Sequence, residues 1–402
     1  MKPRLPVMDD VQRRGLINGA IAAALTFVVG STVLLATGSE GGLELPTATA
    51  TTTSPTPPAC EPSFEIVESA DVPEATTTLL GVAAVTATQA WAVGGTGEPD
   101  APTDVAIQRW DGDEWTIEDA PSPGGFINEL RAVDASGPND VWAVGRTSSG
   151  FGDEPLVLHY DGEAWSEFDL PDEVDGVLND VAAISPTDVW VVGFVGDPAA
   201  SLERALVLHW DGVAWAEVEV RRAIGGGKAA LTGIGWVSPT DIWVVGYHHF
   251  RPLVLRFDGA AWSRSETEIR GDLFAVEPFA TGEVWGIGTP IQRFDGETWT
   301  EANVVRSEGV ELVDGAAVGG RDVWAVGTRS NEDDSATRIA VYRYSGRRWL
   351  PVDGPPVGGS DALTAVDALP DGTVVAVGTK DLEAAGRRTL AIMGSTCPAS
   401  QA

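Results

Sequence analysis

The sequence predicts an all-β fold, a seven-bladed β-propeller with four-stranded blades. The first observation is a repeat of about 40–53 residues that recurs from Leu79 onward, a period typical of propeller blades. The second is the content of 15 tryptophans, most of which stand at two fixed places in the repeat. The third is the stretch "LVLHWDGVAW" at 206–215, whose outline of apolar strand, Asp-Gly turn and Trp recurs, with substitutions, five more times.

Each repeat is predicted to contain four strands, and the first two carry the clearest signals. The innermost strand has a small residue at its centre, which suits crowding around a central axis. These small residues are Ala132, Gly233, Ala275 and Ala365. The second strand is β-branched and aromatic, the composition of a buried strand, and we expect it to end at the glycine of "VWAVG". Its tryptophans are Trp91, Trp142, Trp190, Trp243, Trp285 and Trp324, and the seventh repeat has Val375 there.

An Asp-Gly pair joins the third strand to the fourth. A two-residue type I′ hairpin needs positive φ at both central residues, which Asp tolerates and Gly accepts freely. In such a hairpin Leu208 would face Trp215 across the strand pair. Because this turn chemistry already explains the repeated aspartates, we expect turn residues rather than a metal site. These aspartates are Asp111, Asp161, Asp211, Asp258 and Asp295.

The two ends of the repeat region are predicted to share one blade. The seventh repeat stops after its third strand at "TLAIMGSTC", whereas "CEPSFEIVESADVP" before the first repeat resembles a fourth strand without a partner. The N-terminal segment should therefore supply the outer strand of the last blade and remove its exposed edge. This places Cys60 beside Cys397, and we predict a disulfide between them. The propeller then spans 60–398, with a tail at 399–402.

An uncharged apolar run at 15–38 precedes the repeats and is long enough to span a bilayer as a helix. Basic residues before it and acidic residues after it place 1–14 in the cytoplasm and the repeats outside the cell. We therefore expect a single-pass protein of the cell membrane with a transmembrane signal anchor, a Thr/Pro-rich linker at 39–59 and an extracellular C-terminal domain. The alternative is a cleaved signal peptide, which would leave a secreted protein. Both locations are oxidising and permit the disulfide.

The charge balance excludes one class of partner. The chain has 59 acidic against 26 Lys and Arg residues, a net charge of −33. Phosphate binding depends on Lys and Arg, so we expect no nucleic acid partner. A large net charge of one sign also favours a soluble monomer. No motif indicates a bound cofactor, and none is predicted.

A basic residue recurs late in the third strand, and an acid recurs just before the second. The basic residues are Arg109, His159, His209, Arg256, Arg293 and Arg343. The acids are Asp140, Asp188, Asp241, Glu283 and Asp322. This repetition indicates hydrogen bonds within or between blades. No nucleophile stands with a base and an orienting group, and no carboxylate pair stands out, so no catalytic residues are predicted.

The connections of the fourth repeat differ from the others. Most loops on this face of the predicted propeller are small and acidic, but here they read "RRAIGGGKAA" and "YHHFRP", and the fifth repeat's loop shrinks to "TP". We expect a basic, aromatic site for an anionic partner, such as an extracellular protein segment, an acidic glycan or a carboxylate ligand. Its residues are Arg221, Arg222, Lys228, Tyr247, His248, His249, Phe250 and Arg251. The alternative is a surface loop of accidental composition.

The order apolar strand, "VWAVG", loop, "VLHYDG", Trp resembles the kelch repeat, found in kelch proteins and in the central domain of galactose oxidase. The resemblance covers roughly 60–398 and implies a propeller. In the kelch repeat the second strand ends in a Gly-Gly pair. Here only the first repeat has such a pair, Gly94-Gly95, and the other repeats depart from the kelch pattern at this point. The "DGxxW" motif is also similar to the Asp-box of sialidase-like propellers, which has one more residue between Asp and Gly. The copper chemistry of galactose oxidase would need a Cys–Tyr crosslink. Because both cysteines are assigned to ring closure, we do not expect this chemistry here.

The leading functional prediction is a membrane-tethered extracytoplasmic propeller that acts as a non-catalytic platform for a protein or glycan. One alternative is a sialidase-like or other carbohydrate-active enzyme, which would need paired carboxylates and several arginines over the central channel. Another is an assembly or stability factor for a membrane complex, resembling the Trp-rich propellers that help to build photosystem II. Fold alone does not choose between these alternatives.

Overall fold

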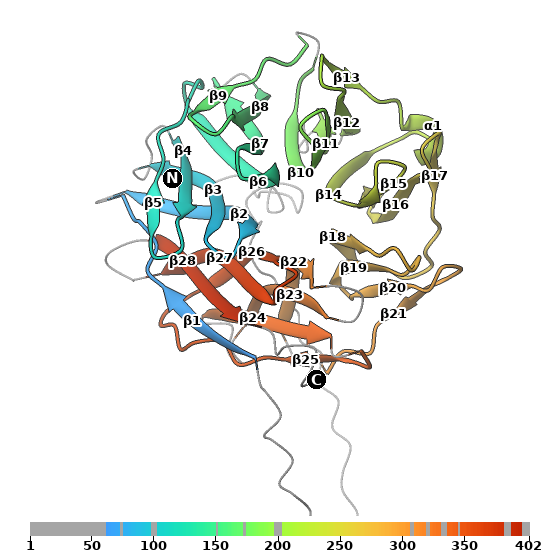
Figure 1. Cartoon of the computed structure of the whole chain (residues 1–402). Helices are drawn as coiled ribbons and strands as arrows, with labels where there is room; N and C mark the ends of the chain where they lie inside the picture. The colour runs from blue at the N-terminus through green and yellow to red at the C-terminus, as the bar shows by residue number, and fades with distance from the viewer. Residues whose placement is uncertain are drawn as a thin grey trace, which may run out of the picture.

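Seven four-stranded antiparallel sheets surround a central axis in the computed structural model (Figure 1). The structure describes residues 62–72, 75–97, 103–149, 152–171, 174–196, 203–305, 309–318, 322–330, 336–344, 346–381 and 387–395. Within these ranges, 28 strands and one four-residue helix are present. The predicted seven-bladed propeller with four-stranded blades is therefore confirmed. We number the blades in chain order, so that blade 1 begins with β2.

Each blade runs from an inner strand at the axis to an outer strand at the rim. The inner strands are β2 (Thr76–Thr86), β6 (Ile127–Gly137), β10 (Val177–Ser185), β14 (Ala229–Ser238), β18 (Asp272–Pro278), β22 (Val310–Ala317) and β26 (Ala362–Ala368). The second strands are β3 (Gln89–Gly97), β7 (Asp140–Ser148), β11 (Asp188–Val195), β15 (Asp241–His248), β19 (Val284–Thr289), β23 (Val323–Ser330) and β27 (Thr373–Asp381). The third strands are β4 (Asp104–Trp110), β8 (Asp153–Tyr160), β12 (Arg204–Trp210), β16 (Arg251–Phe257), β20 (Gln292–Phe294), β24 (Thr337–Tyr344) and β28 (Arg387–Ser395). The outer strands are β5 (Trp115–Ile117), β9 (Trp165–Glu167), β13 (Trp215–Glu217), β17 (Trp262–Arg264), β21 (Trp299–Glu301), β25 (Trp349–Pro351) and β1 (Ser63–Val67).

The N-terminal strand completes the last blade, as predicted. Blade 7 has the strand order β1-β28-β27-β26, and Ser63 at the start of β1 pairs with Ser395 at the end of β28. Cys60 and Cys397 lie outside the described residues, so the disulfide between them stays a prediction. The pairing of Ser63 with Ser395 shows that the described strand ends nearest to the two cysteines lie side by side.

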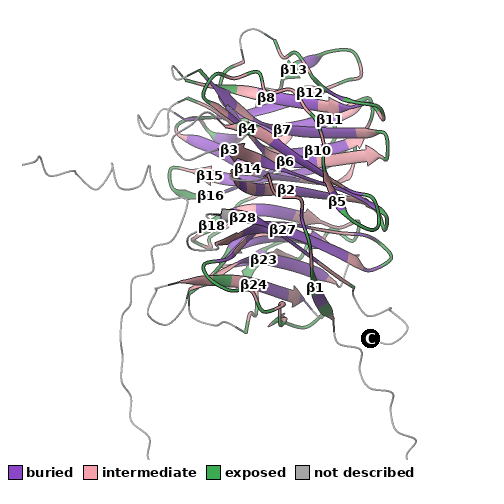
Figure 2. Ribbon diagram, turned by 90° about the vertical axis from the view of Figure 1, so that its left-hand side faces the viewer, coloured by how far each residue is buried: buried purple, intermediate pink, exposed green. Residues whose placement is uncertain are grey.

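Tryptophans join neighbouring blades through edge-to-face contacts. The second-strand Trp of one blade meets the outer-strand Trp of the next, with ring-centre distances of 5.2 Å for Trp91–Trp165, 5.7 Å for Trp142–Trp215, 5.9 Å for Trp190–Trp262, 6.3 Å for Trp243–Trp299 and 5.3 Å for Trp285–Trp349. At the closure, Phe64 of β1 takes the place of a Trp and lies 5.4 Å from Trp324. The repeated Trp thus forms the apolar layer between blades, and the buried residues follow the strands in the side view (Figure 2).

The glycine of "VWAVG" lies inside the second strand rather than at its end, contrary to the prediction. In blade 2, β7 continues beyond Gly145 to Ser148. Gly145 pairs with Leu130 beside a bulge in the inner strand. A Cβ at Gly145 would lie 2.0 Å from the carbonyl oxygen of Glu129. The close approach of the inner strand therefore requires a residue without a side chain.

The pairing across the third and fourth strands differs from the predicted hairpin. In blade 3, Trp210 pairs with Trp215, and Leu208 pairs with Glu217. The predicted pairing of Leu208 with Trp215 is therefore wrong. Four residues lie between the paired tryptophans, so the connection is longer than a two-residue type I′ hairpin.

The side chain of each turn aspartate explains the longer connection. Asp211 Oδ1 accepts hydrogen bonds from the N–H groups of Val213 and Ala214, both at 2.9 Å, while Gly212 adopts a φ of 86°. These backbone N–H groups hold the pKa of Asp211 below its ordinary value. The same pair of hydrogen bonds is formed by Asp111, Asp161, Asp258 and Asp295. The aspartates are turn residues, as predicted, through side-chain hydrogen bonds rather than positive φ.

The expected membrane anchor at 15–38, together with 1–14 and the linker at 39–59, lies outside the described residues. Among the residues that are described, no helix has the length and apolar character needed to cross a bilayer.

Candidate functional site

The eight predicted site residues come together on blade 4. The first three lie in the connection from blade 3, which contains helix α1 (Arg221–Ile224) and three consecutive glycines. The other five occupy the end of β15, the turn after it and the start of β16. The His249 N–H donates to the Lys228 carbonyl oxygen at 3.0 Å and so joins the two segments. We call this set the blade-4 patch: Arg221, Arg222, Lys228, Tyr247, His248, His249, Phe250 and Arg251.

The turn between β15 and β16 is strained. His248 pairs with Arg251, which leaves a two-residue connection, and His249 and Phe250 have φ values of 50° and 63°. Positive φ at both positions is the geometry of a type I′ turn, which favours Asn and Gly. A bulky side chain in this region costs about 1–2 kcal/mol. The turn nevertheless holds the Phe250 ring 74% exposed.

Lys228 and Tyr247 form the internal part of the patch. Lys228 Nζ lies 3.1 Å from Glu203 Oε2, and the two side chains are only 14% and 3% exposed. The ammonium also lies 4.8 Å from the centre of the Phe250 ring, within cation–π distance. Burial, together with a hydrogen bond to Glu203, raises the pKa of the Tyr247 hydroxyl. Both side chains therefore support the turn rather than offer a free charge to a ligand.

His248 is held by two hydrogen bonds. Its Nε2–H donates to the Gly226 carbonyl oxygen at 2.6 Å, and its Nδ1 accepts from Arg264 Nη1 at 3.2 Å. These partners fit the neutral imidazole with its proton on Nε2. The ring centre of His249 lies 4.4 Å from that of His248. His248 therefore positions the glycine loop and its neighbour His249.

The remaining five residues form the accessible part of the patch. Each is exposed, and none of the three arginines has an ion-pair partner among the described residues. They are Arg221, Arg222, His249, Phe250 and Arg251. Next to them, blade 5 has only two residues between β19 and β20, as the sequence predicted. The arrangement can bind a carboxylate, sulfate or phosphate group next to an apolar contact on Phe250.

In blades 2 to 6 the repeated base and acid pair within the blade, which confirms the predicted hydrogen bonds. In blade 1, Arg109 instead lies 4.0 Å from Glu118. The donor–acceptor distances are 2.7 Å for His159–Asp140, 2.8 Å for His209–Asp188, 2.7 Å for Arg256–Asp241, 2.8 Å for Arg293–Glu283 and 2.5 Å for Arg343–Asp322. Each base also lies over the second-strand Trp of its own blade, at 4.1–5.7 Å from the ring centre. These five bases and five acids are therefore engaged in blade structure.

Five carboxylates, none of them among the predicted site residues, lie on the inner strands that surround the central channel. They are Asp134, Asp180, Glu277, Asp314 and Asp367. Four of them accept a backbone N–H from the next blade at 2.7–2.8 Å: Asp134 from Ala183, Asp180 from Ile234, Asp314 from Val366 and Asp367 from Ala84. The fifth, Glu277, has no hydrogen-bond partner among the described residues. Their signal is an acid in otherwise small and apolar strands, as in "AVDA", "AVEP" and "LVDG".

Burial raises the pKa of these carboxyl groups. The pKa rises to about 7 for Asp134, Asp180 and Asp314 and to about 6 for Asp367. For Glu277 the pKa is raised well above its ordinary value, first by burial and then by the other four acids. Among the described residues, none of the five forms an ion pair with an arginine, and no three His, Cys, Asp or Glu side chains are placed to hold a metal ion. Four of the five acids therefore link neighbouring blades through hydrogen bonds to backbone N–H groups.

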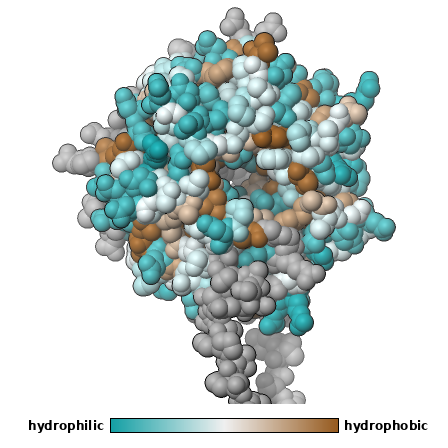
Figure 3. Space-filling model, in the orientation of Figure 1, coloured by the Kyte–Doolittle hydropathy of each residue, from teal (hydrophilic) through white to brown (hydrophobic). Residues whose placement is uncertain are grey.

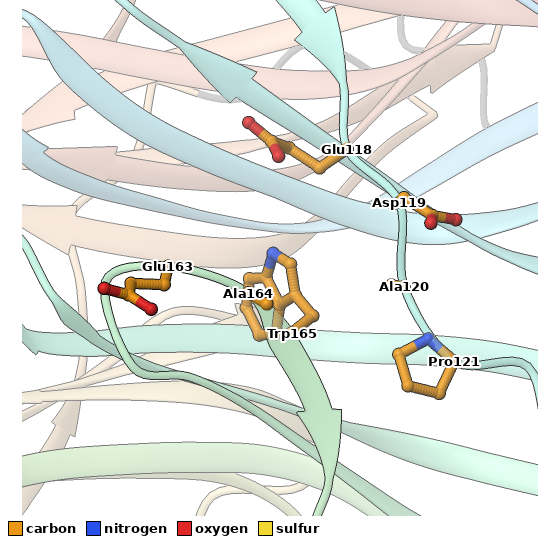
Figure 4. Close-up of a pocket in the computed structure, with 7 residues that line it drawn as sticks. All are labelled: Glu118, Asp119, Ala120, Pro121, Glu163, Ala164 and Trp165. Carbon is orange, nitrogen blue, oxygen red and sulfur yellow. The ribbon is translucent and has the colours of Figure 1, made fainter.

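A cavity of about 430 Å³ opens between the outer parts of blades 1 and 2 (Figure 4). Glu118, Asp119 and Glu163 line it beside the buried indole of Trp165. Three carboxylates at one opening repel an anion. This cavity therefore does not suit the partner predicted for the blade-4 patch. The hub itself appears as a hollow in the space-filling view (Figure 3).

No protein-family model matches the sequence, and no curated protein matches it. Solved structures do share its fold. The structure described as "YCF48 bound to D1 peptide" is 17% identical, with a TM-score of 0.57, and the match covers 83% of this chain and 97% of that one. YCF48 from Cyanidioschyzon merolae is 12% identical, with a TM-score of 0.54 over 82% of this chain and 98% of that one. Inactive virginiamycin B lyase from Staphylococcus aureus with quinupristin is 12% identical, with a TM-score of 0.58 over 83% of this chain and 100% of that one.

These similarities establish a shared propeller fold and nothing finer. The neighbours include a propeller with a bound peptide and a lyase, so the fold itself serves both binding and catalysis. The kelch-like and galactose-oxidase-like character of the repeat stays a prediction. Function therefore has to be argued from the residues of this chain.

Proposed function

We propose that the protein is a non-catalytic binding platform that holds an anionic segment of a partner protein, or an acidic glycan, on the blade-4 patch. The observation that carries the proposal is the strained turn that exposes His249 and Phe250 beside three arginines, none of which has an acidic partner in the part of the chain that the structure describes. Backbone strain concentrates at functional sites, because the surrounding structure must hold it in place. Here Lys228, Glu203 and His248 hold it.

The charge of the whole chain supports an anionic ligand at this place. With a net charge of −33, the protein repels acidic molecules over most of its surface. A local group of arginines is then the place where such a molecule can bind, and repulsion elsewhere adds specificity. The aromatic ring of Phe250 supplies an apolar contact. Peptides and glycans can use such a contact, whereas a small anion does not need it.

The location belongs to the same proposal. A membrane anchor at 15–38 and the Thr/Pro-rich linker at 39–59 would hold the propeller outside the cytoplasm. The kelch-like repeats would form the propeller that presents the binding site. A second candidate is an assembly or stability factor for a membrane complex. A propeller of similar fold with a bound peptide favours it, since an anchored binding platform could hold a segment of a membrane protein.

Binding of defined probes tests the platform. Purified protein is applied to arrays of acidic peptides with aromatic neighbours and of carboxylated or sulfated glycans. The variant with Arg222→Ala, His249→Ala and Arg251→Ala should lose binding while keeping the melting temperature. Arg222→Ala alone is compared with Arg347→Ala in blade 6, which also removes one exposed arginine but far from the patch in sequence.

Unchanged binding by the triple variant would contradict the blade-4 patch as the site. Equal losses from Arg222→Ala and Arg347→Ala would show attraction by overall charge instead. Affinity capture from detergent-solubilised membranes separates the second candidate, because an assembly factor should recover one complex in fixed proportion. That complex should disappear with the triple variant.

A further inference from the structure

Two arginines of blade 6 face each other across neighbouring strands. Arg329 on β23 pairs directly with Arg338 on β24. Like charges directly opposite each other in a sheet are destabilising. Both side chains are exposed, and neither has a hydrogen-bond or ion-pair partner among the described residues. Arg343, on the same β24, does have an acid, Asp322, at 2.5 Å.

The two arginines line a cavity of about 270 Å³. Its other walls include Ile339, Val352 and Val357, all partly buried and apolar. Asp353 is the one acid among the lining residues, and it forms no ion pair with either arginine within the described ranges. The cavity therefore combines an apolar wall with two guanidinium groups that have no acidic partner among the described residues.

We propose that this cavity binds a carboxylate that carries an adjoining apolar group, with Arg329 and Arg338 holding the carboxylate. A guanidinium presents parallel N–H donors that match the two oxygens of a carboxylate. A bound anion would neutralise the repulsion between the two arginines. The apolar wall selects an organic acid, such as the end of a peptide with an apolar last residue, over an inorganic anion.

The site is separate from the blade-4 patch and does not depend on the function proposed for it. Arg329 and Arg338 occupy the places in blade 6 that His248 and Arg251 occupy in blade 4, so both sites lie on one face of the propeller. Blade 5, with its two-residue connection, lies between them. The two sites can therefore be tested with different probes and different variants.

The test uses the full chain and three probes. These are an acetylated Gly-Leu dipeptide with a free carboxylate, the same dipeptide as its amide, and inorganic phosphate. Calorimetry should show binding of the free acid and not of the amide, with phosphate at least about ten-fold weaker. Arg329→Gln and Arg338→Gln should each weaken the free acid about ten-fold or more. Arg347→Gln, an exposed arginine of the same blade, is the matched control and should leave binding unchanged.

Stability without ligand gives a second readout. Arg338→Gln should raise the melting temperature slightly, because it removes the repulsion from Arg329, whereas an arginine with a structural role would lower it. The free acid should raise the melting temperature of the natural protein and not that of the variant. An acetylated Leu-Glu amide, which carries its carboxylate on the side chain, is compared with the dipeptide acid, which carries it at the chain terminus. Binding of either probe supports the carboxylate site, and the tighter of the two shows which kind of carboxylate it prefers.

Several results would overturn the inference. Failure of the natural protein to bind any carboxylate probe would do so, as would equal binding of the acid and its amide. Phosphate binding as tight as that of the dipeptide would reject the apolar selection. The connection between β23 and β24 carries Glu332, Asp333 and Asp334. If the dipeptide acid binds only after these three acids are replaced by Gln and Asn, the two arginines interact with the acids of their own loop and not with a ligand.

Discussion

The stability of the propeller should fall as the pH rises from about 5 to about 7.5, because of the inner-strand carboxylates. Burial raises the pKa of Asp134 from an ordinary 3.8 to about 7. The folded protein therefore keeps a proton that the unfolded chain has already lost between these two values. The stabilising effect is fully present below the unfolded pKa and is lost as the pH rises through the folded one. Asp180 and Asp314 act in the same pH window, and Asp367 in a slightly lower one.

The magnitude follows from the number of protons involved. One retained proton lowers the free energy of unfolding by about 1.4 kcal/mol for each pH unit. The five carboxyl groups keep part of their surface open to the channel, and they repel one another, so they do not titrate as independent buried sites. Counting one proton for the whole set gives a loss of about 3 kcal/mol between about pH 5 and pH 7. The turn aspartates titrate outside this window, because their pKa values are lowered.

Urea unfolding followed by tryptophan fluorescence, at constant ionic strength across this pH range, measures the effect. Glu277→Gln is the informative variant, because it removes a titratable group from the channel without removing a hydrogen bond present among the described residues. It should raise stability at about pH 7.5 and flatten the pH dependence. Asp113→Asn, at an exposed turn position, is the control. A flat or rising stability profile, or the same change from both variants, would refute the reasoning.

Three other outcomes are expected. Gly145→Ala should lower the free energy of unfolding by about 3 kcal/mol or more in urea, because its Cβ would overlap a backbone oxygen, and a loss under about 1 kcal/mol would contradict this. Arg343→Ala should lower the free energy of unfolding by about 2 kcal/mol, because Arg343 is largely buried against Asp322 and Trp324. Arg256 is more exposed, so Arg256→Ala should lower it by under about 1 kcal/mol. Equal losses from the two variants would contradict the role of burial. Reduction of the predicted Cys60–Cys397 disulfide should remove about 3–5 kcal/mol, and peptide mapping that finds both thiols free would reject the bridge.

The fold was predictable because its signals are local and repeated. The period, the paired tryptophans and the unpartnered strand before the first repeat together predict seven blades and a shared last blade. The turn geometry was not predictable from "DG" alone, since Asp211 uses its side-chain oxygen to extend the turn to four residues. The channel acids were missed because only ring closure brings inner strands of distant repeats, such as Asp134 and Asp367, close enough to interact.

The composition of two loops predicted the members of the candidate site but not their separate roles. Lys228 and Tyr247 both meet Glu203, which precedes β12 in blade 3, and this contact depends on the packing of one blade against the next. His248 is held by Arg264 on the outer strand of its own blade. Sequence patterns identify such residues as polar and aromatic, while only the packing shows which of them stay accessible.

The pairing of β1 with β28 also determines the order of events during synthesis. The first β-strand to leave the ribosome is the last to find its place, because its partner is made more than three hundred residues later. Until then Phe64 and the neighbouring apolar residues have no sheet to cover, and the open seam on Trp324 stays available to chaperones and proteases. Long-range contacts slow folding, so the closure of blade 7 should be a late step in the maturation of a newly made molecule.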